Sequence, residues 1–514
     1  MALTKAHSRM IEGAAVNVVD FGAVGDGVTD DTAAIQAALD SGATYVSGVS
    51  GSTYKTTSNL DIPSNVIFDG QGATIVPSFG ALAGLTDVML VSGSDTSGQE
   101  VTDVLIQNWI IDATGSTTNV NFGFQSYGTP YTYKPSHIKF VNNKVINCPS
   151  GGVFIAESTY AEVSGNDFNG GNRGVGTFEA IGGFGDLQKV IITNNTVKNT
   201  TQFGIQTYYG IDITISNNLI EGSAAMVSGD RSCITVDRSR AVVVTGNVCR
   251  NAPNDQIFAT GVYECSIVGN TCVGGNGGIQ VCYNFEDAED ASIKESYYVT
   301  VTGNTINYNA TQPLILNGVR KSVVSANVIR GGLATYGLIV QDQTRSGDSV
   351  AMLTQDVSII GNIGELGLQQ SISNGDQTTV VYMGNELASY TGPSNTQVIL
   401  DKSFNLLRMG RIQLDEVGLI KRTGMGAGNI FIREGRLADE SYHKGFTERY
   451  SYGVMRYYDS TGTQSFSVDI GGGAGKKDIQ LHKDGAGLIV NSPDGLTTLR
   501  IGIDNSGNIV TTTP

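Results

Sequence analysis

The sequence predicts an all-β fold of the parallel β-helix class, and both its composition and an internal repeat support that prediction. Glycine occurs 67 times and proline 10 times among 514 residues, and only 16% of the residues are charged. A chain rich in Gly, Asn and Thr with many Val and Ile is typical of β-structure rather than of helices or disorder. From residue 138 onward, a short phrase recurs in which two apolar runs flank an asparagine. We therefore expect a solenoid in which each repeat forms one coil.

The asparagine is the most regular residue of the repeat. Its successive spacings are 23, 29, 23, 29, 23, 34, 23, 35 and 23 residues, which is a constant minimum with insertions that would form loops outside the coils. Apolar residues stand three positions before it and two positions after it, as expected for strands with one buried face. Stacked coils lie about 4.8 Å apart, so the asparagines should form a ladder. They are Asn143, Asn166, Asn195, Asn218, Asn247, Asn270, Asn304, Asn327, Asn362 and Asn385.

Residues 16–39 combine glycines and aspartates with a helical pattern. We expect a short strand, a turn, and then a helix that is capped by Thr29 and carries Asp30 and Asp31 in its first turn. Gly42 should end that helix. The glycines do not fit the G-x-G-x-x-G spacing of a dinucleotide site, and the aspartates do not fit a calcium loop. The stretch is therefore predicted to be an N-terminal helix cap, which covers the open end of the solenoid.

Four segments are expected along the chain. Residues 1–15 are a short N-terminal attachment or linker segment, and residues 16–76 form the cap and the first coils. Residues 77–397 form the β-helix with the face that would bind substrate. The asparagine phrase stops before residue 398, and glycine-punctuated short strands follow to residue 514. Residues 398–514 are predicted to form a smaller C-terminal β domain for trimerisation, with an end cap or a carbohydrate-binding domain as alternatives.

The charge balance and the cysteines exclude several classes of function. With 48 acidic and 32 basic residues, the net charge is −16, which disfavours a phosphate backbone as a partner, so no nucleic acid is expected. No run of about 18 apolar residues predicts a membrane span, and the first residues lack the apolar core of a signal peptide. The six cysteines contain no C-x-x-C pair and are predicted to be buried free thiols. Neither a metal site nor a cofactor is expected.

The N-terminal part of the chain also carries a family resemblance. The stretch "NVVDFGAVGDGVTDDTAAIQAALDSG", followed by "YKTTSNLDIPSNVIFDGQGATI", resembles the pectate-lyase-like superfamily as it occurs in bacteriophage tailspike depolymerases. The resemblance is specific over residues 8–76 and diffuse through the coils to residue 390. It implies a right-handed parallel β-helix, a homotrimer in the phage tail, and attachment to a tail or baseplate protein through the N-terminus. It also implies binding and cleavage of bacterial capsular polysaccharide or lipopolysaccharide O-antigen, but it carries no catalytic motif.

A second set of strands, outside the asparagine phrase, is expected to form the substrate face. Alternate residues there should point outward, and they include aromatic, amide and acidic side chains that suit a sugar chain, because rings stack on pyranose faces and polar groups bind hydroxyls. The predicted outward residues include Phe154, Thr235, Phe258, Asn317 and Gln341. The predicted substrate-binding residues are Tyr208, Tyr209, Gln206, Arg238, Gln280, Tyr283, Asp230, Arg231 and Asp255.

Glu157, Glu179 and Asp237 are the predicted catalytic residues, of which two would form a carboxylate pair. Glycoside hydrolysis needs two carboxyl groups about 5 Å apart when one is a nucleophile, or about 6.5–9.5 Å apart when water fits between them. Glu157 and Glu179 occupy equivalent places in adjacent coils, about 5 Å apart in backbone, and Asp237 lies two coils beyond Glu179. Repulsion between paired carboxylates would raise one pKa and create the acid. The first hypothesis is therefore an endo-acting glycoside hydrolase.

Three alternatives remain open from the sequence. In a polysaccharide lyase, Tyr208 or Tyr209 beside Arg238 would remove the proton next to a uronate carboxylate, and cleavage would follow by β-elimination. In a non-catalytic adhesin, the same face would bind the glycan without cleaving it. Deacetylation ranks last because the sequence has no G-x-S-x-G motif.

Overall fold

The computed structural model describes residues 15–365, with gaps at 80–85, 93–97, 116–119, 129–132, 179–186, 223–231, 284–295, 309–311, 332–335 and 345–350. From residue 367 onward it describes individual strands. The chain divides into two compact units, Met1–Thr396 and Gln397–Pro514. Among the described residues, no helix has the length and apolar character needed to cross a membrane.

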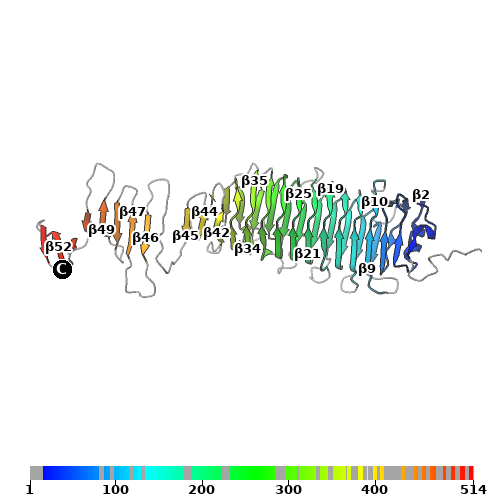
Figure 1. Ribbon diagram of the computed structural model, residues 1–514, viewed down its shortest axis with the longest axis horizontal. Coiled ribbons are helices and arrows are strands. Elements are labelled where there is room, and N and C mark those ends of the chain that lie inside the picture. The colour runs from blue at the N-terminus through cyan, green and yellow to red at the C-terminus, as the bar shows by residue number, and fades with distance from the viewer. Residues whose placement is uncertain are drawn as a thin grey trace, which may run out of the picture. The chain divides into compact units, whose positions relative to one another are not determined.

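The first unit is a parallel β-helix. Each coil contributes strands to three parallel sheets, named here sheets A, B and C, and the strands of one sheet stack along the helix axis (Figure 1). The chain passes from sheet C to sheet A, then to sheet B, and returns to sheet C in the next coil, as β11, β12, β13 and β14 do. The fold class predicted from the sequence is confirmed.

The strands of the first unit are short, and their bounds are as follows. Sheet A contains β1 (Val16–Asn17), β3 (Tyr45–Ser47), β6 (Val66–Asp69), β9 (Thr102–Gln107), β12 (Ser136–Val141), β15 (Thr159–Ser164), β18 (Ile191–Thr193), β21 (Ile211–Ser216), β24 (Arg240–Thr245), β27 (Tyr263–Val268), β30 (Ser296–Tyr297), β31 (Thr300–Thr302), β34 (Val319–Ser325), β39 (Gln355–Ile360) and β42 (Val380–Asn385). Sheet B contains β2 (Asp26–Asp30), β4 (Thr53–Thr56), β7 (Thr74–Pro77), β10 (Ile110–Asp112), β13 (Lys144–Ile146), β16 (Asp167–Asn169), β19 (Thr196–Lys198), β22 (Leu219–Glu221), β25 (Val248–Arg250), β28 (Thr271–Val273), β32 (Thr305–Tyr308), β35 (Val328–Gly331) and β40 (Ile363–Gly364). Sheet C contains β5 (Leu60–Asp61), β8 (Met89–Ser92), β11 (Phe122–Tyr127), β14 (Gly151–Ala156), β17 (Arg173–Phe178), β20 (Phe203–Tyr208), β23 (Ile234–Asp237), β26 (Ile257–Thr260), β29 (Gly277–Cys282), β33 (Gln312–Asn317), β36 (Tyr336–Gln341), β41 (Gly367–Ser371) and β43 (Tyr390–Thr391).

The predicted asparagine ladder is present at the turn between sheets A and B. From Asn166 onward, the side-chain oxygen of each asparagine accepts a hydrogen bond from the backbone N–H of the asparagine in the preceding coil. Asn195 Oδ1, for example, accepts from the backbone N–H and the side-chain nitrogen of Asn166 at 3.0 and 2.9 Å. The side-chain nitrogen of Asn195 donates to Val163 O and Asn218 Oδ1. The ladder runs from Asn143 to Asn385, and its members are buried. Buried polar groups are therefore satisfied along the whole corner.

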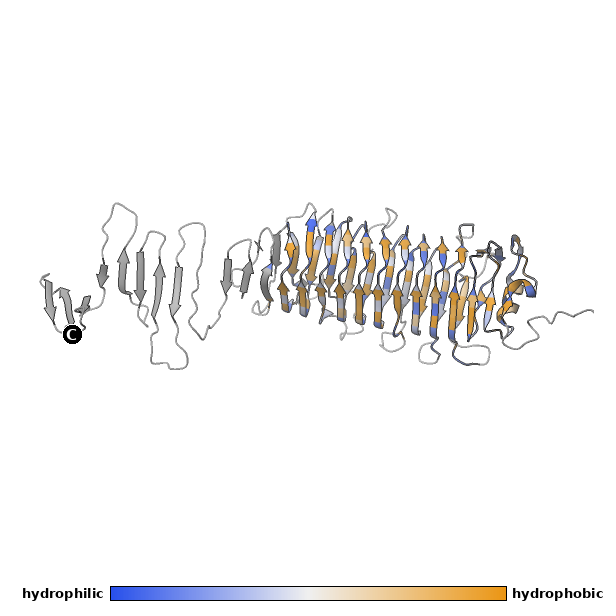
Figure 2. Cartoon of the chain, in the orientation of Figure 1, coloured by the Kyte–Doolittle hydropathy of each residue, from blue (hydrophilic) through white to orange (hydrophobic). Residues whose placement is uncertain are grey.

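The interior of the coils is apolar. Alternate strand residues point inward and are buried, among them Val153, Ile205, Ile234 and Ile279 on sheet C. Hydrophobic residues are concentrated along the strands (Figure 2). All six cysteines are buried free thiols, as predicted, and Cys249 and Cys272 pair in register between neighbouring strands of sheet B.

The N-terminal cap contains a helix, but the predicted start of that helix is wrong. The 3₁₀-helix η2 (Val18–Phe21) is followed by β2 and then by α1 (Thr32–Leu39), whose N-cap is Asp31 rather than Thr29. The Asp26 carboxylate accepts hydrogen bonds from Thr29 N at 2.7 Å and from the Thr29 hydroxyl at 2.9 Å. This local loop holds Thr29 in β2, which pairs with β4 (Thr53–Thr56). The α1 helix still buries Ile35, Ala38 and Leu39 against the end of the solenoid.

The remaining described strands pair in antiparallel fashion. In the first unit, β37 (Gln343–Thr344) pairs with β38 (Ala351–Met352). In the second unit, β44 (Val398–Asp401) pairs with β45 (Leu406–Met409). One sheet contains β46 (Ile430–Glu434), β47 (Gly445–Arg449), β48 (Val454–Tyr458), β49 (Gln464–Asp469) and β50 (Ile479–Leu481), and another contains β51 (Leu488–Asn491), β52 (Thr498–Ile503) and β53 (Ile509–Thr512). The second unit is therefore a β domain of different topology from the solenoid.

Candidate functional site

The outward row of sheet C carries polar and aromatic side chains, with a gap at Gly176. The strand pairing places its residues side by side in successive coils, with their backbones about 4.8 Å apart. Most of these side chains are half-buried, while Thr235 is buried. Phe154 also stacks on Phe122 with ring centroids 4.9 Å apart. In register, the row is Gln125, Phe154, Gly176, Gln206, Thr235, Phe258 and Gln280.

At the C-terminal edge of sheet C, four predicted residues form one cluster. Tyr208 and Asp237 are register partners in β20 and β23, and Tyr209 and Arg238 follow them directly in the chain. The Arg238 guanidinium forms an ion pair with Asp237, with 3.0 Å between Nε and Oδ1. Its Nη1 donates to the Tyr209 hydroxyl at 3.0 Å, and its Nη2 donates to the Tyr208 hydroxyl. The guanidinium carbon lies 4.2 Å from the Tyr208 ring centroid and 4.7 Å from that of Tyr209, so both rings also hold the cation.

The local backbone explains why the cluster is compact. The residues directly after β20, β23 and β14 adopt a left-handed conformation, with φ of 58° at Tyr209, 44° at Arg238 and 42° at Glu157. This sharp turn folds the side chain back over the strand end, so all three residues are buried. The sequence predicted them at the strand ends but did not reveal this burial.

Burial and hydrogen bonding set the protonation of the cluster. Burial raises the pKa of Tyr209 to about 12, against the opposing charge of Arg238, so Tyr209 is neutral near pH 7. Burial acts to lower the pKa of Arg238, but the hydrogen bond and charge of Asp237 outweigh it, so the pKa is raised and the guanidinium stays charged. The Tyr208 oxygen thus accepts from Arg238 and is hydrogen-bonded to Tyr209. The Arg238 guanidinium therefore faces the oxygen that would become negative if Tyr208 lost its proton.

Two of the three predicted catalytic carboxylates, Glu157 and Asp237, lie within the described residues. Glu157 is buried, with 1% of its surface exposed. Ala156 pairs with Phe178, so position 157 and position 179 follow equivalent strand ends in adjacent coils, but Glu179 lies outside the described residues, as do Asp230 and Arg231. Of the predicted catalytic carboxylates that the structure describes, Asp237 lies in the cluster with Tyr208, Tyr209 and Arg238.

The remaining predicted binding residues lie at three different places. Gln206 and Gln280 are on the outward row of sheet C. Tyr283 follows β29 and is buried, at the turn equivalent to that of Arg238 two coils further on. Asp255 is buried before β26, at the opposite end of the sheet C strands, so the structure does not bring it to the cluster.

One titratable residue that the sequence analysis missed also lies beside sheet C. Asp87 precedes β8, is 9% exposed and accepts a hydrogen bond from Phe122 N at 3.1 Å. Burial raises its pKa to about 6, although the hydrogen bonds from Phe122 and Asn121 oppose the shift. The local sequence gives no motif around Asp87 because its environment comes from the following coil.

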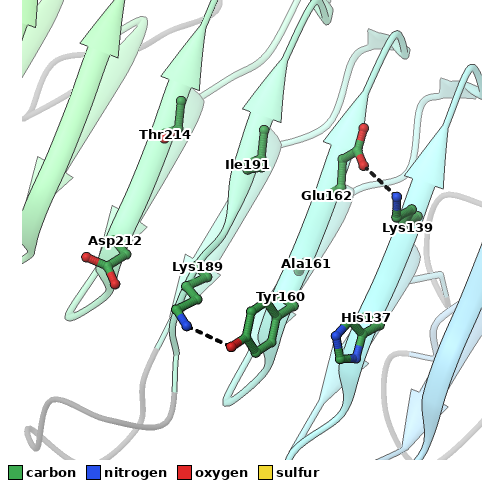
Figure 3. A pocket seen from close by; sticks show the side chains of 9 residues that line it. All are labelled: His137, Lys139, Tyr160, Ala161, Glu162, Lys189, Ile191, Asp212 and Thr214. Carbon is green, nitrogen blue, oxygen red and sulfur yellow. Dashed lines mark hydrogen bonds and ion pairs between the residues drawn. The ribbon is translucent and has the colours of Figure 1, made fainter.

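Sheet A carries a separate, open hollow of about 370 Å³ on its outward face (Figure 3). Lys189 Nζ is 2.7 Å from the Tyr160 hydroxyl, and the His137 ring stacks on Tyr160 with centroids 4.8 Å apart. Lys139 and Glu162 form an ion pair at 3.2 Å. In the part of the chain that the structure describes, no group of three His, Cys, Asp or Glu side chains is arranged to hold a metal ion.

Comparisons with known proteins agree with this architecture. Residues 15–227 match the family described as "Rhamnogalacturonase A/epimerase, pectate lyase-like". This match covers less than half of the 514 residues. The match includes Tyr208 and Tyr209 but ends before Asp237 and Arg238.

Individual relatives cover smaller or more distant parts. Mannuronan C5-epimerase AlgE5 from Azotobacter vinelandii is 40% identical over 119 residues, which is 21% of this chain and 10% of that protein. The chain thus spans about a tenth of the length of this curated relative. Among solved structures, the Streptococcus pneumoniae adhesin PfbA has 16% identity and a TM-score of 0.49, covering 73% of this chain and 100% of that one. The Dettilon tailspike protein has 15% identity and a TM-score of 0.48, covering 86% of this chain and 77% of that one.

Proposed function

We propose that this protein is an enzyme that binds an acidic polysaccharide along the outward row of sheet C and removes a proton from it at the Tyr208 cluster. The observation that carries the proposal is the hydrogen bond that the Arg238 guanidinium donates to the Tyr208 oxygen, while the same guanidinium also holds Tyr209 and Asp237. A tyrosine whose oxyanion is stabilised in this way can act as a general base. Because Arg238 is 3% exposed, it acts by stabilising and orienting the tyrosines rather than by direct contact with a long substrate.

The reaction would begin at a uronic acid. The Tyr208 oxygen, as a phenolate, takes the proton from the carbon next to the carboxylate, and the electron pair of the broken C–H bond moves into the carboxylate to give an enolate. In elimination, that electron pair forms a C=C bond, the neighbouring C–O bond to the next sugar breaks, and the leaving oxygen receives a proton. In epimerisation, the same carbon receives a proton on the opposite face. In either case water supplies that proton, because the Tyr209 hydroxyl is buried and is held with Tyr208 on the same guanidinium.

The relatives support the substrate class. The names of the curated relatives describe C5-epimerases acting on mannuronan, and C5 of a uronic acid is the carbon that carries the carboxylate. The family that matches residues 15–227 is described by both a rhamnogalacturonase and an epimerase. Epimerisation was not among the reactions predicted from the sequence, and it shares its first step with the predicted lyase.

Hydrolysis remains the second candidate. It is supported by the pairing of Ala156 with Phe178, because Glu157 and Glu179 are the residues that follow these two in the sequence. A pair drawn from Glu157, Glu179 and Asp237 would then act as acid and base or nucleophile.

We also propose that the protein works as a phage tailspike on a bacterial capsule or O-antigen. This rests on the resemblance of residues 8–76 to tailspike depolymerases. In that setting it would be a homotrimer in the virion tail, attached to a tail or baseplate protein by its N-terminus, with residues 398–514 holding the trimer together. Analytical ultracentrifugation of the full chain would test the trimer, and a monomer would contradict it.

The deciding experiment incubates the protein with capsules and lipopolysaccharides from a panel of strains, in D₂O. Chain shortening with new ultraviolet absorbance would identify elimination, and deuterium at C5 without shortening would identify epimerisation. Shortening without new absorbance or deuterium would reject proton abstraction in favour of hydrolysis. A glycan that is bound but unchanged would reject catalysis in favour of an adhesin.

A further inference from the structure

We propose a second polysaccharide-binding site on sheet A, separate from the Tyr208 cluster, that takes an anionic glycan. It consists of six side chains on four successive coils, from β24 to β34, and is named here the tyrosine–arginine patch. Its members are Arg240, Tyr263, Tyr297, Tyr298, Arg320 and Lys321.

The backbone of sheet A doubles the number of outward side chains at this edge. The residue directly after Tyr263, Tyr297 and Arg320 has a positive φ in each coil, which is 57° at Glu264, 54° at Tyr298 and 49° at Lys321. A left-handed residue interrupts the alternation of a strand, so two consecutive side chains face solvent instead of one. Tyr297 and Tyr298 are accordingly half-buried and exposed, while the next residue, Val299, is buried.

The first row of the patch is in register across the four coils. Arg240 pairs with Tyr263, Tyr263 pairs with Tyr297, and Tyr297 pairs with Arg320. Three spacings of about 4.8 Å make the row roughly 14 Å long. Two arginines thus flank two tyrosines on a flat surface.

The tyrosine rings are tilted toward one another rather than stacked face to face. Tyr263 and Tyr298 meet edge to face at 5.3 Å and 84°, and Tyr297 and Tyr298 are tilted by 44°. Each ring has its own cation, with Arg240 4.9 Å from Tyr263, Arg320 5.9 Å from Tyr297 and Lys321 5.6 Å from Tyr298. Ring surfaces and hydroxyls for sugars, and cations for carboxylates or sulfates, therefore occur together.

The charge of the patch is unusual for this protein. The chain carries a net charge of −16, but the two consecutive outward positions in each of these four coils include three cations and one acid, Glu264. Glu264 pairs with Arg240 at 3.3 Å on the surface, where both side chains are about half exposed. The corresponding positions from β9 to β21 have two acids, Asp103 and Asp212, and one lysine, Lys189. Acids also border the patch, because Ile211 pairs with Arg240 and Arg320 pairs with Gln355, which sets Asp212 and Asp356 at its two ends. The three cations beside the tyrosine rings, rather than a net positive field, are therefore the groups that would bind an anionic ligand.

The test is equilibrium binding of sodium polygalacturonate and of uncharged dextran to the full chain. The patch variant is Tyr298→Asn with Lys321→Asn, because asparagine tolerates the left-handed backbone at both positions. The matched control is Tyr160→Asn with Lys189→Asn, another tyrosine and lysine on successive coils with left-handed backbone, and Tyr160 and Tyr298 are 46% and 44% exposed. Circular dichroism and size-exclusion light scattering would establish fold and assembly for each.

We expect the wild type and the control variant to bind polygalacturonate with the same Kd and the patch variant to bind it at least about tenfold more weakly. Added salt should weaken wild-type binding. Equal Kd values for patch and control variants, or dextran bound as tightly as polygalacturonate, would overturn the proposal. So would a wild type that binds no polygalacturonate, or a patch variant that changes only the oligomeric state, which would assign the patch to contacts between copies of the chain.

Discussion

Replacing Asn195 by alanine should destabilise its coil far more than changing its neighbour. The Asn195 side chain takes part in four buried hydrogen bonds, two from Asn166, one to Val163 O and one to Asn218 Oδ1. At about 1 kcal/mol each, their loss would cost about 4 kcal/mol, and the Asn166 N–H would be left without its acceptor. A solenoid transmits such a loss mainly to adjacent coils, so the effect should be local.

Hydrogen exchange measured peptide by peptide is the appropriate assay, because a multi-coil solenoid need not unfold in one step. A loss of about 4 kcal/mol corresponds to roughly 10³-fold faster exchange in the affected coil. Asn194→Gly is the matched control, because Asn194 has φ of 56° and the equivalent position is a glycine at Gly246 and Gly269. That control should change stability by less than about 0.5 kcal/mol. Equal exchange in the two variants would refute the stabilising role of the ladder.

Three further predictions concern the site and the core. Tyr208→Phe should lower turnover by about 10²–10⁴-fold in a glycan-modification assay while pull-down on the same glycan persists, and unchanged turnover would remove Tyr208 from the mechanism. Burial raises the pKa of Asp87 to about 6 from its ordinary 3.8, so the folded state favours the protonated carboxyl, and the free energy of unfolding falls by about 3 kcal/mol as pH rises through that interval. Asp87→Asn should therefore raise the thermal midpoint at pH 7.5 but not at pH 4. Melting temperatures of wild type and variant that follow parallel curves against pH would contradict this. Because burial raises the pKa of Cys249 well above its ordinary value, iodoacetamide should label this thiol only after unfolding, and rapid labelling of the native protein would show that the core is open.

The solenoid could be predicted because its signal repeats in every coil. The asparagine positions, the apolar positions around them and the inward residues of sheet C all follow from one periodicity, and the ladder bonds confirm the register. The helix start in the cap could not be predicted in the same way, because Asp26 and Asp31 compete for nearby backbone N–H groups and no repeat distinguishes them. Asp26 binds the N–H groups of Val28 and Thr29, and Asp31 binds those of Val24 and Gly25.

The four residues of the Tyr208 cluster could be selected from the sequence, but their contacts could not be predicted, and their functional role stays a prediction. Tyr208, Tyr209, Asp237 and Arg238 were selected from strand ends on sheet C, and the register brings these four together. Their mutual contacts depend on the left-handed backbone at Tyr209 and Arg238, which a two-residue alternation of polar and apolar residues does not reveal. Asp87 was missed for the related reason that its burial is produced by Phe122 and Asn121 of another coil.

The turn after the sheet C strands connects the fold to the proposed chemistry. Glycine occupies it at Gly261 and Gly318, with φ of 58° and 62°, where the left-handed backbone has no steric cost. At Tyr209 and Arg238 the same backbone is adopted by large polar residues, at a cost of about 1–2 kcal/mol each. The solenoid does not require these side chains, since glycine closes the same turn in other coils. What they provide is a buried cation held by two tyrosine hydroxyls, and this is a reason to look for the function of the protein at these two coils.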